Sequence, residues 1–303
     1  MKARSAAVVE ANVVRQEFLA FAGLLFATFG WASAFVAGKM VLAELTPLVA
    51  ATCRYALATL MLLPFALRTR SHAAIRPALA PLGVMVVCGG VLYPWLFLAA
   101  LSRTSATNTS LLIALNPVFT VLLVPLIGER LGQQRLAGVL LALVGATTVI
   151  TRGNIRHVTE ITLNTGDLLA VAAAACWAAF NLASRRTVTQ LSPALTNAVI
   201  YGGGGVILGM LARGDHPWQQ LASASAAAVT GVALMALLSS VLAGQLFLLG
   251  VRTLGVGRTV VFVYFVPLVT AVLSALVLGE SFESPQAIGG VAVLAGVYFS
   301  SQK

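Results

Sequence analysis

Arg54 is the one ionisable side chain that lies well inside a long apolar run of this sequence. Its guanidinium offers paired donors that match a carboxylate, and an ionisable residue inside a membrane span is a functional candidate by default. The matching position in the second half of the chain is Ile200, so the charge is not shared by both halves. A second interpretation stays open: Arg54 lies seven residues past Pro47, roughly 10 Å along a helix, and a long side chain can extend from there to a membrane interface.

Carboxylates and imidazoles lie at the ends of the apolar runs or between them. Glu129 and Glu280 follow Pro117 and Pro267 by twelve and thirteen residues, roughly 18–20 Å along each helix. This placement favours capping of the next helix over proton transfer. An intramembrane hydrolase would need a nucleophile beside a histidine or aspartate. We therefore expect no enzymatic activity, no cofactor and no metal site.

Aromatic and amide side chains share helix faces in several apolar runs. Trp177 and Asn181 are spaced i, i+4, and their counterparts Trp31 and Phe35 mark one face in the first half. Amides on membrane helices point inward, where they bond across helices or contact a ligand; both alternatives stay open, as does an interfacial belt for the tryptophans. The expected substrate-binding residues are Trp31, Phe35, Arg54, Tyr93, Asn116, Trp177, Asn181, Gln245 and Tyr264.

Three prolines, Pro94, Pro117 and Pro267, interrupt apolar runs and are expected to act as hinges or kinks. Each deprives the carbonyl four residues earlier of its helical donor, and a freed carbonyl in a membrane must face protein, water or ligand. Three acceptors at mid-depth would suit a substrate ammonium group. Alternatively, the prolines only curve the helices, and serine, threonine or water satisfies the carbonyls. The carbonyls concerned are those of Gly90, Ile113 and Val263.

Ten apolar spans must position these residues. With 59% hydrophobic and 9% charged residues, the chain lacks the charge that a soluble domain carries, so the lipid bilayer is its expected surroundings. The basic excess, 19 against 9, sits in short gaps without aromatic interleaving, which argues against nucleic acid as a partner. Most spans are near the roughly 20 residues that cross the hydrocarbon. The expected spans are 18–38, 47–67, 78–101, 104–127, 133–151, 167–184, 193–212, 226–250, 257–279 and 285–301.

The chain contains one pattern twice. Trp31 and Pro47 recur as Trp177 and Pro193, 146 residues later. Five spans in each copy turn the second copy upside down relative to the first, which makes an inverted-topology repeat. One chain then supplies both halves of a site, so a monomer suffices, and a dimer stays an alternative. The expected division is a tail at 1–17, a first five-helix repeat at 18–151, an external connector at 152–166 and a second five-helix repeat at 167–301.

The basic residues predict the orientation of the spans. If both termini are cytoplasmic, thirteen Lys and Arg residues fall on the cytoplasmic side and five on the other. That is a positive-inside bias. Glycines inside the spans, at 202–205 and at 138, 145, 289, 290 and 296, are expected to let helices pack closely.

One motif recurs with similar spacing in both copies, and this repeated motif resembles that of a known family. The run from Pro117 through Gly128-Glu129-Arg130 to Gly138 and Gly145, with its echo from Pro267 through Gly279-Glu280 to Gly289 and Gly296, resembles the twin repeat of the drug/metabolite transporter superfamily. More narrowly, it resembles the ten-helix exporters, which include a bacterial aromatic amino-acid exporter. The resemblance covers roughly residues 18–301. It implies an all-α, ten-helix basket around a central cavity, with the fifth and tenth helices at the side.

The residues and the resemblance together favour an exporter. Several basic residues would be expected in a cavity for phosphorylated sugars, and an intramembrane carboxylate in one for cationic drugs. We therefore expect a bacterial inner-membrane exporter of amino acids with aromatic or large apolar side chains, or of related metabolites. Alternating access by uniport or exchange is the expected mechanism, because no span carries a carboxylate or histidine at mid-depth and Arg54 does not release its proton. A proton-coupled drug/metabolite antiporter is the alternative.

Overall fold

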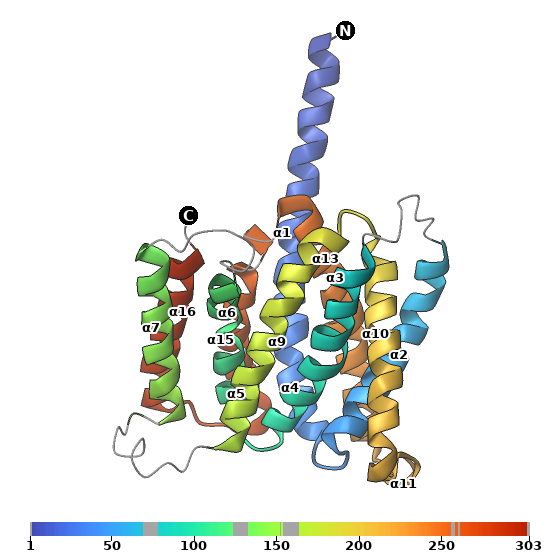
Figure 1. Ribbon diagram of the computed structural model, residues 1–303, viewed down its shortest axis with the longest axis vertical. Helices are drawn as coiled ribbons and strands as arrows, with labels where there is room; N and C mark the ends of the chain where they lie inside the picture. Colours follow the sequence, from blue (N-terminus) through green and yellow to red (C-terminus); the bar gives the residue numbers. More distant parts are fainter. Residues whose placement is uncertain are drawn as a thin grey trace.

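The protein is a bundle of helices that stand side by side, with α1 projecting beyond it (Figure 1). The computed structural model describes residues 2–68, 78–123, 133–151, 153, 164–255, 258–259 and 261–301, and every regular element in these ranges is helical. The two ends of the chain lie at the same end of the bundle, which we call the terminal end (Figure 1). The opposite end, where α1 stops at Val41, is called the distal end.

Residues 2–17, expected as a tail, continue into the first span as a single helix. The described residues of the first half of the chain form eight helical elements. The elements are α1 (Lys2–Val41), α2 (Pro47–Arg68), α3 (Leu79–Val84), the π-helix η2 (Met85–Leu92), α4 (Tyr93–Leu101), α5 (Ala106–Ile113), α6 (Asn116–Leu123) and α7 (Gln133–Ile150).

The second half follows a similar order and adds, among the described residues, the short helix α11 and two 3-10 helices. Its elements are α9 (Thr165–Thr187), α10 (Pro193–Leu211), the 3-10 helix η4 (Ala212–Asp215), α11 (Pro217–Ser223), α12 (Ala226–Leu234), the π-helix η5 (Met235–Leu242), α13 (Ala243–Leu254), the 3-10 helix η6 (Val261–Phe265), α15 (Val266–Leu278) and α16 (Ser284–Ser301).

Seven helical stretches in the described residues are long and apolar enough to cross a membrane. Three shorter apolar helices, at 136–150, 262–278 and 284–299, accompany them. All of these fall at spans expected from the sequence. Residues 124–127, expected to end the fourth span, lie outside the described residues. The structure therefore shows a multi-helix membrane protein whose helix positions follow the apolar runs.

Local sequence sets where the helices of the second half begin. Ser192 precedes Pro193, and its hydroxyl accepts a hydrogen bond from the Leu195 amide at 3.2 Å, which is the expected N-cap of α10. Thr46 precedes Pro47 at the equivalent point, but its hydroxyl instead donates to the Asp215 carboxylate at 2.7 Å. Both spans start at their expected prolines, and the expected capping role of Thr46 is replaced by a contact with the other half of the chain.

Glycines bring two helix pairs into close contact. At one edge of the bundle α7 lies beside α16 (Figure 1). A Cβ added to Gly145 would lie 2.6 Å from the Gly289 carbonyl oxygen, and one on Gly296 would lie 2.5 Å from that of Gly138. On the other side of the bundle α10 packs on α2 and η2 through the glycines at 202–205. These contacts confirm the predicted packing role, although Gly290 faces Leu111 of α5 rather than α7.

The three prolines expected to act as hinges or kinks lie where the helix changes type or breaks. Pro94 lies at the start of α4, where a π-helix continues directly into an α-helix. Pro267 lies where the 3-10 helix η6 continues into α15. Pro117 lies at the start of α6, after the chain has left α5 at Ile113, so its missing amide falls in the first turn of a helix.

Candidate functional site

A central cavity lies between the two halves of the chain. Its walls come from α1, α2, η2, α4, α5 and α6 of the first half and from α9, α10, η5, α13, η6 and α15 of the second. The cavity volume is about 60 Å³, room for a few water molecules. The cavity must therefore widen before a molecule the size of an amino acid can enter.

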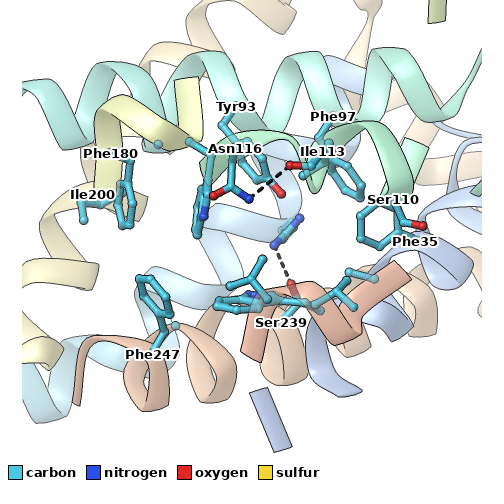
Figure 2. A pocket seen from close by; sticks show the side chains of 18 of the residues that line it. Phe35, Tyr93, Phe97, Ser110, Ile113, Asn116, Phe180, Ile200, Ser239 and Phe247 are labelled. Atoms are coloured by element: carbon cyan, nitrogen blue, oxygen red, sulfur yellow. Dashed lines mark hydrogen bonds between the residues drawn. The ribbon is translucent and has the colours of Figure 1, made fainter. Parts of the chain in front are cut away.

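Arg54 lies in the cavity wall. Its side chain is buried, with the residue 6% exposed. Nε donates to the Ser240 hydroxyl at 2.8 Å. Nη2 donates to the Ser239 hydroxyl at 2.9 Å (Figure 2), and both serines belong to η5. Two of the five guanidinium donors are used, which leaves three without a hydrogen-bond partner among the described residues.

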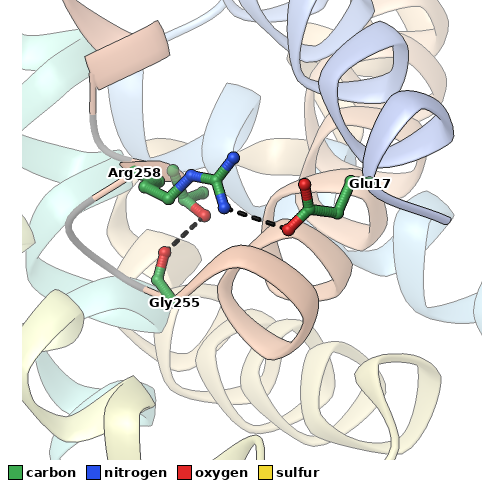
Figure 3. A network of polar contacts seen from close by, with 4 residues as sticks. Glu17, Gly255 and Arg258 are labelled. Atoms are coloured by element: carbon green, nitrogen blue, oxygen red, sulfur yellow. Dashed lines mark hydrogen bonds and ion pairs between the residues drawn. The ribbon is translucent and has the colours of Figure 1, made fainter. Parts of the chain in front are cut away.

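The cavity lining holds no carboxylate to balance Arg54. The ion pair found within the described residues joins Arg258 to Glu17 at 3.0 Å, on the exposed surface at the terminal end (Figure 3). Serine hydroxyls satisfy two donors of Arg54 but bring no negative charge. A buried charge without a counter-charge is costly.

Aromatic rings form the rest of the wall. Trp31 and Trp177 meet edge to face with ring centroids 6.0 Å apart, and Trp31 also contacts Phe247 at 5.3 Å. Trp177 contacts Tyr93 at 4.7 Å. Phe35 contacts Phe97 at 5.0 Å between ring centroids; several of these side chains surround the cavity in Figure 2. Trp31 and Trp177 are therefore cavity walls.

Asn116 and Asn181 bond to each other. The Asn181 amide nitrogen donates to Asn116 Oδ1 at 3.3 Å, and Asn116 Nδ2 donates to the Ile113 carbonyl at 3.2 Å (Figure 2). Pro117 is the reason that this carbonyl needs a partner, and the neighbouring side chain supplies it. Asn116 borders the cavity, whereas Asn181 does not. Interhelical bonding, one of the two alternatives for these amides, is what the structure shows.

Two further expected residues lie away from the cavity. Gln245 donates through Nε2 to the Pro193 carbonyl at 3.2 Å, which ties α13 to the start of α10. Tyr264 is buried in η6 but does not border the cavity. Six of the expected substrate-binding residues line the cavity: Trp31, Phe35, Arg54, Tyr93, Asn116 and Trp177.

Sequence reasoning missed several residues of the lining. A usable signal existed for two pairs, because Phe97 recurs as Phe247 at 150 and Tyr55 recurs as Tyr201 at 146. The tyrosine rings meet with centroids 4.7 Å apart, and each hydroxyl donates to a π-helix carbonyl. No sequence signal pointed to the serines of η5. The missed lining residues named here are Tyr55, Phe97, Phe180, Asn197, Tyr201, Ser239 and Phe247.

Carboxylates at the distal end cap helices of the opposite half of the chain. Glu280 accepts hydrogen bonds from the Ala106 amide at 2.9 Å and from the amide and hydroxyl of Thr107 at 3.2 and 3.0 Å. Glu44 accepts from the Ser225 amide and hydroxyl at 2.7 and 2.6 Å. Capping was expected for Glu280, but the helix it caps is α5 and not the following α16. Glu129 lies outside the described residues.

Hydrogen bonding also sets the protonation behaviour of Glu44. The Ser225 hydroxyl and then its amide stabilise the carboxylate, and together they lower the pKa of Glu44 below its usual value. Near Glu280, a second cavity of about 550 Å³ opens at the distal end. Its charged lining residues are Lys39, Arg103, Glu280 and Glu283.

The chain is similar to known proteins over most of its length. The model of the EamA-like transporter family matches residues 18–151 and again residues 164–302. An uncharacterized transporter of Archaeoglobus fulgidus is 28% identical over 90% of this chain and 94% of its own length. A probable amino-acid metabolite efflux pump of Salmonella typhimurium is 25% identical over 89% and 90% of the two chains. A crystal structure covering 92% of this chain and 95% of its own matches the fold with a TM-score of 0.62 at 16% identity.

Proposed function

Because this chain belongs to the EamA-like transporter family of the drug/metabolite transporter superfamily, we propose that it exports amino acids with aromatic or large apolar side chains, or related metabolites. The chain is a membrane transporter of this family. A relative named as a probable amino-acid metabolite efflux pump, 25% identical, supports the substrate class. The bacterial inner membrane is the proposed location.

The observation that carries the proposal is the position of Arg54. Its guanidinium borders the cavity with three free donors and no carboxylate in the lining, and aromatic rings surround it. An arginine fork binds a carboxylate through two parallel charge-assisted hydrogen bonds. Aromatic faces such as that of Trp177 bind a ring or an aliphatic side chain. One cavity thus offers a place for each end of such a substrate.

Alternating access between two inverted five-helix repeats, ten spans in all, is the proposed mechanism. The family model matches the chain twice, which supports two repeats with a boundary at 152–166. Packing is also repeated: α1 packs on α13, and its counterpart α9 packs on α4. The π-helices η2 and η5 are 150 residues apart at both ends. Rocking of one half against the other would widen the narrow cavity toward one side at a time.

We propose that both termini face the cytoplasm, on the basic-residue bias. Uniport or exchange fits the cavity because no carboxylate or histidine lines it. A single chain supplies both halves of the cavity, so a monomer is sufficient for transport.

Counterflow in proteoliposomes tests the proposal. Vesicles loaded with unlabelled amino acid should take up labelled phenylalanine, leucine and alanine, and a labelled nucleotide sugar serves as the negative control. Arg54→Gln should lower the apparent affinity for phenylalanine about tenfold or more, because a hydrogen bond to a charged group contributes about 1.5–3 kcal/mol. Arg258→Gln is the matched control, since an exposed ion pair contributes little. Uptake of the nucleotide sugar alone would overturn the proposed substrate class.

A further inference from the structure

We propose that the cavity recognises the carboxylate of its substrate but not the ammonium group, so that the protein also exports aromatic 2-oxo and 2-hydroxy monocarboxylates. This inference rests on the proposed function and deepens it. Its basis is the charge of the cavity wall. Arg54 is the only charged side chain among the lining residues, so the empty cavity has a formal charge of +1.

The charge balance favours a monoanion over a zwitterion. A monocarboxylate neutralises Arg54 and leaves the occupied cavity without net charge. A zwitterion brings a carboxylate and an ammonium together, and the occupied cavity then keeps its net charge of +1. Because the lining offers no carboxylate, the ammonium of an amino acid gives up water for neutral oxygens and aromatic faces. The carboxylate is thus the end for which the cavity supplies a counter-charge.

The neutral polar groups of the same cavity also favour an oxygen at the position of the ammonium. Asn197 is 2% exposed and borders the cavity, and its amide nitrogen has no hydrogen-bond acceptor among the described residues. The hydroxyl oxygens of Ser239 and Ser240 each accept a hydrogen bond from the Arg54 guanidinium. The cavity that holds Arg54 therefore has a spare donor in the Asn197 amide. A keto or hydroxyl oxygen can accept from this donor, whereas an ammonium cannot.

Gly244 lets α13 approach the wall that holds the unpaired Asn197 amide. A Cβ at Gly244 would lie 3.3 Å from the amide nitrogen and in collision with the Tyr201 hydroxyl. The absence of a side chain at Gly244 therefore leaves this space to Tyr201 and Asn197, both of which border the cavity.

Competition against labelled phenylalanine in counterflow tests the inference. Three analogues each remove one group: phenylpyruvate and 3-phenyllactate lack the ammonium, and phenethylamine lacks the carboxylate. We expect the two acids to inhibit within about threefold of unlabelled phenylalanine, and phenethylamine to fail at a hundredfold excess. If phenylalanine is carried but neither acid competes, the inference is wrong while the proposed function stands. If phenethylamine competes as well as phenylalanine, or phenylalanine is not carried, both are overturned.

Charge movement provides a second readout. A valinomycin-clamped potassium potential of 59 mV, positive inside, should accumulate labelled 3-phenyllactate about tenfold in proteoliposomes with equal unlabelled phenylalanine on both sides. A monoanion moves one charge whether it enters alone or in exchange for a zwitterion. Labelled phenylalanine should not accumulate, since a zwitterion moves none. Protein-free liposomes and Arg54→Gln vesicles control for leakage of the acid. An accumulation of 3-phenyllactate equal to that in the controls would contradict the inference.

Asn197→Asp is the variant that separates recognition from folding. Asparagine and aspartate have the same shape, and the new carboxylate would pair with an ammonium or with Arg54 itself. Inhibition by phenylpyruvate should fall about tenfold, with phenylalanine counterflow reduced less. An equal loss for both substrates would contradict the proposed role of the uncompensated charge. The control variant is Asn197→Gln, which keeps the donor and should retain the wild-type ratio of phenylpyruvate inhibition to phenylalanine counterflow.

Discussion

The rings of Tyr55 and Tyr201 lie in contact, with centroids 4.7 Å apart, although the residues are 146 positions apart in the chain. They occupy the same place in the two copies of the sequence pattern, as do Trp31 and Trp177, whose rings are 6.0 Å apart. In the proposed inverted repeat, equivalent residues can touch only near the axis that would relate the two copies. Both pairs border the same cavity.

We expect Tyr201→Phe and Tyr55→Phe to destabilise the protein by similar amounts. Each hydroxyl donates to a buried carbonyl, Tyr55 to Gly89 at 3.1 Å and Tyr201 to Ser240 at 2.8 Å. Removing a buried donor costs about 1 kcal/mol of unfolding free energy. Denaturant titration in detergent micelles would measure this, with the exposed Tyr298→Phe as control. Unchanged stability in both variants would show that these bonds contribute nothing.

Aromatic contact predicts substrate selectivity. Trp177→Ala and Trp31→Ala should reduce transport of phenylalanine more than transport of alanine, by about two- to tenfold, because an aromatic pair contributes about 0.5–1.5 kcal/mol beyond buried area. Initial rates of counterflow for the two substrates give the ratio. An equal loss for both would indicate a packing defect, since these rings also contact Phe247 and each other.

Stability should depend on pH through Glu44. Its pKa is lowered in the folded protein, so the stabilising contact with Ser225 is fully present above the unfolded value of 4.5 and is lost as pH falls through the folded value. Glu44→Gln should therefore be less stable than wild type at neutral pH and should converge with it in acid. Thermal denaturation in detergent across this pH range measures the difference. Ser225→Ala should show part of the same dependence, and parallel curves at every pH would refute the assignment.

Transport should proceed without obligatory proton exchange. Glu280 is engaged by three donors at the start of α5 and is absent from the central cavity lining. With equal amino acid on both sides of the vesicle membrane, an imposed pH gradient should produce no net accumulation. Uphill accumulation that an uncoupler abolishes, and that Glu280→Gln or Glu129→Gln removes, would instead establish the proton-coupled antiporter.

Cysteine labelling tests the proposed orientation. Thr189→Cys lies on the exposed terminal end and Arg213→Cys on the exposed distal end, in a background lacking the three free cysteines at 53, 88 and 176. In intact cells an impermeant thiol reagent should modify the cysteine at 213 and not the one at 189. The opposite pattern would reverse the topology derived from the basic residues.

Helix positions were predictable because the lipid imposes a simple rule on composition. A run of about 20 apolar residues must satisfy its backbone hydrogen bonds internally, so helices appear wherever such runs occur. The span expected at 47–67 is observed as Pro47–Arg68, and that at 193–212 as Pro193–Leu211. Helix type was not predictable. Pro94 indicated an interruption, but the π-helix that precedes it depends on packing against α10.

Residue type and spacing identified candidates for the site but not their surroundings. A single arginine in an apolar run and two tryptophans at repeated positions were candidates for the cavity, with the membrane interface as the open alternative. Amides were ambiguous because Asn and Gln bond equally well to a ligand or to a neighbouring helix. Asn116 and Asn181 found each other, Gln245 found the Pro193 carbonyl, and these partners come from distant parts of the chain.

The sequence by itself determined the helical membrane character, the duplicated pattern and the scarcity of charge in the spans, because composition and spacing are local properties that the bilayer acts on directly. Only the tertiary structure decided that Arg54 meets Ser239 and Ser240 across 185 and 186 residues and lies in an aromatic wall without a counter-charge. Glu280 likewise caps α5 of the other half rather than its own next helix. Such partners are chosen by helix packing, which brings together residues that no spacing along the chain can connect.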